Sequence, residues 1–288
     1  LQAESPEERA STEDRQHYAW SRAVNAMAFR DFESAEQWLA VAEELTPDDP
    51  YGTTLRVSWL SAQDRYDEAL ELARTNFGQH PRHRASVEAL ADMLELRAEF
   101  EAAHEVLRTS APAEECGAFH LALARIEREL GRHADVLVSV ERAEKLLPLV
   151  ETDGQRHLAG LRSDARYFGD DLEGAIAEAK RAGPGFFQDL AERLEARREG
   201  KRTILDVGFV RQHHMTCVPA TLSTLGNFWE RRVDHLELVE RICYDGTPAH
   251  SERKWAKENG WVTREFSTDY ATASALVDRK IPFVITTV

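Results

Sequence analysis

One cysteine of this sequence is placed where it could do chemistry. Cys217 precedes Pro219 and a run of apolar residues at helical spacing, which predicts that it lies at the start of a helix. Free backbone N–H groups and the positive end of the helix dipole favour the thiolate form of a cysteine there. Gln212, five residues earlier, can offer a side-chain amide to the same helix end. A thiolate beside an amide donor is what acyl transfer needs as nucleophile and oxyanion donor.

Two other interpretations of this cysteine compete with a nucleophile. Many lone cysteines are small buried hydrophobes, and Cys217 could be one of them. His213, His214, Cys217 and Cys243 could also be combined into a zinc site. That set fits no standard zinc spacing and would consume the nucleophile. We therefore predict neither a metal nor another cofactor.

The stretch around Cys217 resembles a known family. Gln212 and Cys217 at this spacing, followed by Pro219 and an apolar helix, resemble the bacteriocin-processing, or double-glycine leader, peptidases, which are papain-like cysteine peptidases. The resemblance covers about residues 202–288, under a third of the chain. It implies that Cys217 is the nucleophile and that Gln212 is the oxyanion-hole donor.

A papain-like site also needs an imidazole to accept the thiol proton and a further group to orient that imidazole. The resemblance places the imidazole on a strand that follows a segment such as 281–288. No histidine follows His250, and neither His250 nor His213 and His214 match that position. We therefore expect the general base and its orienting residue to lie beyond Val288. On this view the chain is a fragment and shows no peptidase turnover by itself.

The segment that must position Cys217 is predicted to mix helices with strands. The predicted strands are 204–210, 261–266 and 281–288, and the predicted helices after the one at Cys217 are about 233–243, 251–259 and a last one ending near 279. Ser267, Thr268 or Asp269 caps that last helix. This order resembles the papain-like α+β architecture, here incomplete at the C-terminus.

The chain before residue 200 carries an internal repeat of 34 residues. Three sets of residues recur at this spacing: Ala35, Ala69 and Ala103; Phe32, Tyr66 and Phe100; and Pro47 and Pro81. The alanine lets two helices approach closely, the aromatic fills the space beneath the turn, and the proline ends the second helix. Looser units around Val136 and Ala175 bring the count to five. They resemble tetratricopeptide repeats and predict a helical-hairpin solenoid.

Repeat arrays of this kind resemble peptide-binding scaffolds in which the first helix of each unit lines a groove. Four residues on or near the predicted first helices could contact a polypeptide: Trp20, Tyr51, Arg125 and Arg128. Each has a simpler interpretation, because aromatics also pack between repeats and arginines are often only solvated. A polar helix from Phe186 to Gly200 is predicted to cap the array. The predicted domains are therefore a polar segment 1–15, repeats 16–200 and a peptidase-like domain 201–288.

The composition of the chain limits the classes of partner and the cellular location that we expect. The formal net charge of −15 argues against nucleic acid and anionic membranes. No apolar run approaches the length that crosses a bilayer. Three widely spaced cysteines do not form a disulfide framework, which predicts a reducing, cytoplasmic location.

Two classes of function follow from these patterns. The first is a cysteine peptidase-like hydrolase, using thiol acyl-transfer chemistry, whose repeats bind a polypeptide. The alternative is a non-catalytic protein–protein interaction scaffold with a degenerate peptidase-like module. The substrate and its cleavage site are not encoded in any motif of the sequence.

Overall fold

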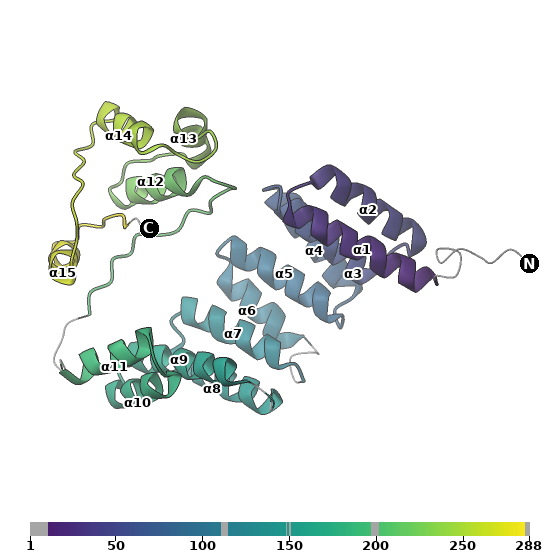
Figure 1. The fold of residues 1–288 in the computed structure, drawn as a ribbon, viewed down its shortest axis with the longest axis horizontal. Coiled ribbons are helices and arrows are strands. Elements are labelled where there is room, and N and C mark those ends of the chain that lie inside the picture. Colours follow the sequence, from purple (N-terminus) through teal and green to yellow (C-terminus); the bar gives the residue numbers. More distant parts are fainter. Residues whose placement is uncertain (1–10, 111–114, 148, 150, 197–201, 286–288) are drawn as a thin grey trace, which may run out of the picture. The chain divides into compact units, whose positions relative to one another are not determined.

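The computed structural model describes residues 11–110, 115–147, 149, 151–196 and 202–285. The chain divides into two compact units, Leu1–Arg198 and Glu199–Val288 (Figure 1). The predicted boundary at Gly200–Lys201 lies outside the described residues. Unit 1 contains α1 (Thr12–Ala28), α2 (Phe32–Leu45), α3 (Pro50–Ser61), α4 (Tyr66–Gln79), α5 (Arg84–Leu96), α6 (Phe100–Thr109), α7 (Gly117–Glu129), α8 (His133–Leu146), α9 (Thr152–Phe168), α10 (Leu172–Ala182) and α11 (Phe186–Ala196).

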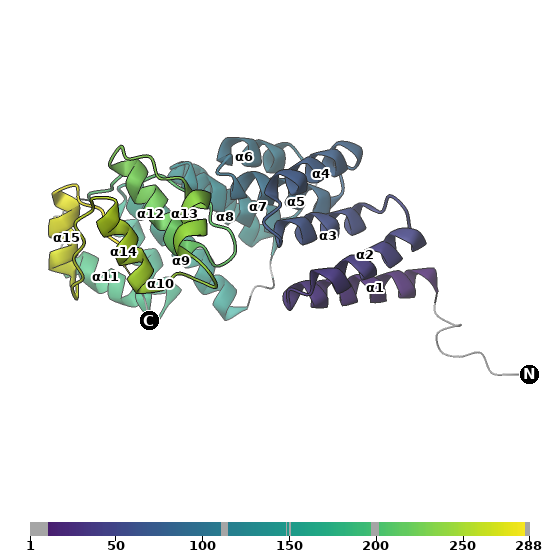
Figure 2. The same ribbon diagram turned by 90° about the horizontal axis from the view of Figure 1, so that it is seen from above.

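Helices α1 to α10 form five consecutive hairpins, which Figure 2 shows from above. The recurring alanines explain the close pairing: Ala35, Ala69 and Ala103 are all fully buried, and Ala175 holds the same place in the fifth hairpin. The recurring aromatics Phe32, Tyr66 and Phe100 are the first residues of α2, α4 and α6. The prediction of helical-hairpin repeats is therefore confirmed.

Each hairpin turns through one residue with left-handed backbone. These residues are Arg30, Asp64, Ala98, Gly131 and Asp170, with φ between 57° and 69°. In every case the N–H of the following residue donates to the carbonyl five residues before it, at 2.8–3.1 Å. This bond satisfies a carbonyl at the end of the first helix. Only one of the five residues is glycine, so the sequence gives little sign of this repeated turn.

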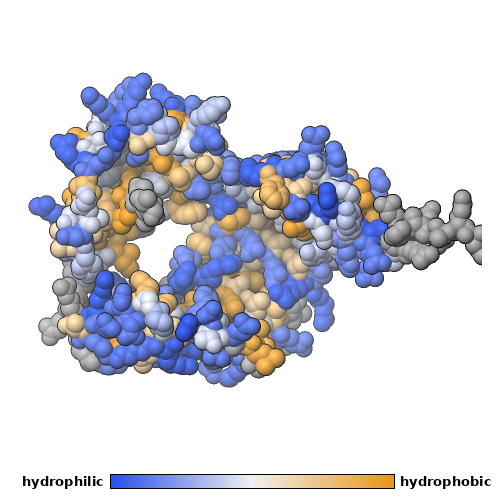
Figure 3. Space-filling view, in the orientation of Figure 1, coloured by the Kyte–Doolittle hydropathy of each residue, from blue (hydrophilic) through white to orange (hydrophobic). Residues whose placement is uncertain are grey.

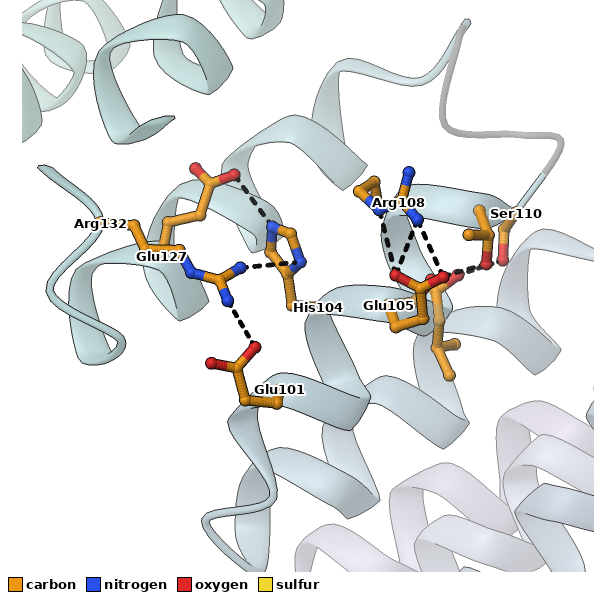
Figure 4. Close-up of polar contacts among 9 residues, drawn as sticks. Glu101, His104, Glu105, Arg108, Ser110, Glu127 and Arg132 are labelled. Atoms are coloured by element: carbon orange, nitrogen blue, oxygen red, sulfur yellow. Dashed lines mark hydrogen bonds and ion pairs between the residues drawn. The ribbon is translucent and has the colours of Figure 1, made fainter. Parts of the chain in front are cut away.

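The third and fourth hairpins are joined by a polar relay (Figure 4). Arg132 donates to Glu101 at 2.6 Å and to Nδ1 of His104 at 3.4 Å. Because arginine can only donate, Nδ1 of His104 must accept, and Nε2 carries the hydrogen that faces Glu127 at 3.3 Å. The Glu127 side chain is only 6% exposed. The relay thus gives Oε1 of this buried carboxylate a partner, while Oε2 is buried without one among the described residues, at a junction where the repeat spacing becomes irregular.

The last helix of unit 1 covers the end of the array. The prediction placed a capping helix from Phe186 to Gly200, and α11 occupies Phe186–Ala196. Ala191 is fully buried and packs with Ile176 and Ala179 of the fifth hairpin. The predicted residues after 196 lie outside the part of the chain that the structure describes.

Unit 2 contains α12 (Cys217–Phe228), α13 (His235–Ile242), α14 (Ala249–Glu258) and α15 (Tyr270–Asp278). Leu238, Ile242 and Trp255 form its small buried core. Arg231 places its guanidinium 4.7 Å from the ring centre of Trp261, which packs at the edge of this core. Of the three residues predicted to cap α15, Asp269 is the one that caps it, because its side chain accepts a hydrogen bond from Thr272 N at 2.8 Å.

The predicted strands of unit 2 are wrong for the described residues. No residue of 202–285 belongs to a strand, so the expected α+β papain-like architecture is not formed there, and 286–288 lie outside the described residues. Burial does alternate along 203–207, as in a half-buried strand, but Val207 N donates locally to Leu205 O at 3.0 Å. A strand needs a partner strand for its backbone groups, and alternation alone supplies none. Among the described residues, no helix is long and apolar enough to cross a membrane.

Candidate functional site

The predicted nucleophile lies at a firmly packed helix end. Cys217 is the first residue of α12 and its side chain is exposed. The helix behind it is fixed against the segment that leads to α13, because Ser223 Oγ donates to Val233 O at 2.6 Å. Gly226 permits this contact, since a Cβ at this position would lie 2.6 Å from the Val233 side chain. Cys217 therefore sits on a rigid element while its sulfur faces solvent.

The turn before Cys217 is organised by one buried hydroxyl. Thr216 Oγ1 lies 2.8 Å from His213 N, 3.0 Å from His213 O and 3.0 Å from Nε2 of His235. Met215 adopts a left-handed backbone with φ of 59°. Cys243 Sγ donates to Met215 O at 3.3 Å. Both ends of α13, at His235 and just beyond Ile242, thus hold this turn.

The N-terminus of α12 lacks the usual side-chain cap. Thr216 occupies the capping position, where a threonine hydroxyl normally accepts from a backbone N–H of the first turn. Its hydroxyl bonds to His213 and His235 instead, and no capping hydrogen bond is formed. The dipole end of α12 is consequently left uncapped by side chains beside the Cys217 thiol.

Gln212 and Cys217 line the same groove, which has a volume of about 420 Å³. Its other walls are mainly apolar and come from both ends of unit 2: Leu205, Val207, Phe209, Val277, Pro282 and Phe283. In Figure 3, hydrophobic residues appear beside α12, whereas the outer surface of α13 and α14 is mainly hydrophilic. The structure therefore brings together the two residues that the sequence analysis paired. Whether they catalyse a reaction stays a prediction.

His235 bears on this site through the turn that precedes Cys217. His235 is buried, and desolvation lowers its pKa, helped by the nearby His213 ring at 5.6 Å. Its Nε2 is bonded to Thr216, so it acts on the turn. His250 lies in α14. Cys243, expected at the end of a helix over about 233–243, lies just beyond α13, and Cys116 precedes α7. Within the described ranges, no three His, Cys, Asp or Glu side chains are arranged to hold a metal ion.

A second surface with functional features lies on unit 1. We call the exposed side of α1, α3, α5, α7 and α9 the first-helix face. Its N-terminal part is aromatic: Trp20 of α1 and Tyr51 of α3 meet edge to face with ring centres 4.8 Å apart, and His17 lies 5.3 Å from Trp20. Trp20 and Tyr51 therefore pack between repeats, as their simpler interpretation expected, and Tyr51 remains 41% exposed.

The central part of the first-helix face is charged. Arg125 of α7 binds Glu95 of α5 at 2.7 Å and Asp92 of α5 at 3.3 Å. Desolvation raises the pKa of Asp92, and Arg125 only partly opposes it. The Asp92 side chain is nevertheless 58% exposed, so solvent and a binding partner can reach it. Desolvation likewise raises the pKa of Asp164 in α9, opposed by Arg128.

Sequence reasoning found Arg125 and Arg128 on this face but missed their carboxylate partners. Arg125 follows Asp92 by 33 residues, about one repeat length, so a search for opposite charges one repeat apart would have found the pair. Thr216 and His235 were also missed. They are 19 residues apart and belong to no shared pattern, so no comparable signal exists for them.

Comparison with models of known protein families and with curated proteins finds no match. Solved structures do show a likeness. A tetratricopeptide repeat protein of Thermus thermophilus, TTC0263, is 17% identical with a TM-score of 0.45, covering 62% of this chain and 96% of that one. MamA gives 12% identity, a TM-score of 0.47 and coverage of 67% and 100%. MamA of Desulfovibrio magneticus RS-1 is 15% identical with a TM-score of 0.44, covering 66% of this chain and 100% of that one. Likeness at this level says nothing about a partner or an activity.

Proposed function

We propose that the repeat array binds a polypeptide along the first-helix face. The observation that carries this proposal is the row of side chains on successive first helices, from the partly buried Trp20 with the exposed Tyr51 to the exposed Asp92–Arg125 pair. A row of this kind can follow an extended chain, because each hairpin adds one more set of contacts. The other sides of these helices are engaged in the array's core.

The charges on α5 favour a partner with cationic side chains. Glu88, Asp92 and Glu95 lie on one side of the helix, and Glu88 is paired with Arg84 at 2.9 Å. Arg125 serves both remaining carboxylates, and its Nη2 lies closer to Glu95 than to Asp92. A lysine or arginine of the partner would give Asp92 the neutralising contact that it shares at present.

The test is selection of short random peptides on the full 288-residue protein, followed by anisotropy measurements on the selected peptides. Recurrent sequences that carry Lys or Arg are expected. Their affinity should fall roughly tenfold in a Tyr51→Ala, Asp92→Asn double variant, an amount that corresponds to about 1.4 kcal/mol. Glu71→Ala, an exposed change on α4, is the matched control and should leave affinity unchanged. Selection without recurrent sequences, or equal loss in the control, would contradict the proposal.

We propose a second function, thiol acyl transfer at Cys217. The specific observation in its favour is that an exposed thiol at an uncapped helix N-terminus shares an apolar groove with Gln212. In this function the Cys217 thiolate attacks an acyl carbonyl, and the Gln212 amide donates to the oxyanion that develops. Collapse of that oxyanion breaks the bond to the alcohol or amine leaving group, which takes up a proton from solvent, and leaves a thioester on Cys217. The apolar walls of the groove fit an acyl group or peptide with hydrophobic side chains next to the reacting carbonyl.

Two reagents separate the roles of these residues. An activated p-nitrophenyl ester of a hydrophobic peptide should acylate Cys217, as read by intact mass, and Cys217→Ala should abolish the adduct. Gln212→Ala should slow acylation by about 10²–10³ if the amide stabilises the oxyanion. The same variant should leave alkylation by iodoacetamide unchanged, because alkylation develops no oxyanion. Equal slowing of both reactions would show that Gln212 only shapes the groove.

A further inference from the structure

The turn that precedes Cys217 is held by groups from another helix, and the hydrogen-bond count of Thr216 shows how. A hydroxyl has one hydrogen and two acceptor positions. Thr216 Oγ1 donates to His213 O at 3.0 Å and accepts from His213 N at 2.8 Å. The remaining acceptor position faces His235 Nε2 at 3.0 Å, so this nitrogen must carry the hydrogen. The hydroxyl is then fully used.

A fully used hydroxyl cannot cap α12. A capping threonine accepts from the N–H of the second or third helical residue. Pro219, the third residue of α12, has no N–H, so the only N–H that Thr216 could cap in this way is that of Val218. This N–H belongs to the residue next to Cys217. Whatever holds the Thr216 hydroxyl in its present orientation therefore decides whether that N–H is available to an anion at the thiol.

We propose that His235 is a positioning residue for Cys217, because its Nε2–H keeps the Thr216 hydroxyl directed away from the helix N-terminus. The biological role of this contact rests on the thiol function proposed above. Three observations support it: Thr216 and His235 are both buried, they are within hydrogen-bonding distance at 3.0 Å, and Cys243 Sγ binds Met215 O from the other end of α13. Helix α13 thus holds the turn at two points.

The experiment measures the rate at which iodoacetamide alkylates Cys217 across a pH series, in the full 288-residue chain. His235→Phe keeps a ring but removes the N–H donor, so the Thr216 hydroxyl is free to cap Val218. We expect labelling at neutral pH to slow by about two- to fivefold, the range that one helix-end interaction gives. His235→Gln places an amide N–H at similar reach and should restore the wild-type profile.

A second variant tests the route of the effect. Adding Thr216→Val to His235→Phe removes the hydroxyl that would cap the helix, so labelling should recover toward the wild-type rate. A purely structural role of His235 predicts no such recovery. Wild-type labelling in His235→Phe, slow labelling in His235→Gln, or no recovery in the double variant would each overturn the proposal. Fast labelling of wild-type Cys217 without acylation by the ester would refute the thiol function and leave the positioning role intact.

Discussion

Unit 1 and unit 2 differ in how far along the chain their stabilising contacts reach. In unit 1 the polar links between hairpins join residues about one repeat apart, such as Trp59 Nε1 with Phe32 O and Arg125 with Glu95. In unit 2, Thr203 Oγ1 donates to Asp278 Oδ1 across 75 residues, and the groove is lined from both ends of the unit. Closing a long loop costs more chain entropy than closing a short one. The fold of unit 1 is therefore specified locally, whereas unit 2 depends on contacts between its ends.

The two units also differ in the size of their hydrophobic cores, and the core of unit 2 is the smaller. Twelve of the twenty large hydrophobic side chains that are exposed among the described residues lie in unit 2, which is less than a third of the chain. Its buried apolar cluster centres on four residues of α13 and α14, while one cluster of unit 1 runs from α1 to α7. Because buried apolar area is the main favourable term in folding, unit 2 should be the less stable unit.

The largest expected effect comes from the same truncation made in each unit. Leu107→Ala in α6 and Leu238→Ala in α13 both remove a buried side chain and should cost about 2–5 kcal/mol each. Because repeats couple mainly to their neighbours, the unit 1 change should speed hydrogen exchange mostly in α5–α8. The unit 2 change should speed exchange throughout α12–α14. Leu236→Ala, at a half-exposed site, is the control. If Leu107→Ala speeded hydrogen exchange equally over all of unit 1, the proposed difference between the units would be contradicted.

A smaller effect tests the close approach of paired helices. Ala103→Leu inserts a larger side chain at a fully buried site and should destabilise unit 1 by about 1–3 kcal/mol. Ala102→Leu makes the same change at the exposed neighbouring position and should be close to neutral. Urea denaturation of both variants gives the difference. Equal midpoints would mean that the alanine column does not mark the contact between helices.

The hairpin turns allow a matched pair of substitutions with opposite signs. Gly131→Ala should destabilise the fourth hairpin by about 1 kcal/mol, because alanine is strained at a φ of 69° even where space is open. Ala98→Gly relieves the same strain in the third hairpin and should stabilise it by a smaller amount, since glycine gains entropy in the unfolded chain. Thermal unfolding measures the change in melting temperature of each variant. Shifts of the same sign would contradict the argument.

The smallest expected effect concerns pH and is confined to unit 2. Desolvation and His213 lower the pKa of His235, while Thr216 and Asp234 oppose them without reversing the shift. The unfolded chain then binds a proton more readily than the folded one, so stability should fall as pH drops from about 7 to about 5. His235→Gln does not titrate and should remove this part of the dependence. Hydrogen exchange in α12–α14 is the measurement, and an unchanged slope in the variant would be the contrary result.

The difference between the units also explains what the sequence could predict. Ala69, Tyr66 and their equivalents carry the hairpin pattern because each hairpin makes the same local contacts. The helix at Cys217, its pairing with Gln212 in one groove and the cap at Asp269 were accessible for similar reasons. The strands were not, because alternation along 204–210 does not reveal whether a partner strand lies beside it. The role of His235 required the fold of the 213–216 turn, which no local pattern encodes.

The repeated left-handed turns have a mechanical consequence. Each hairpin ends its first helix with the same turn, and four of the five pair their helices through a buried alanine, so neighbouring hairpins resemble links of similar strength. When the two ends of such an array are pulled apart, links should detach one at a time from the ends. A repeat of 34 residues spans about 110–120 Å when fully extended, which sets the upper limit of each lengthening step. Under load, the array would lengthen in near-equal increments and shorten again as each hairpin re-forms.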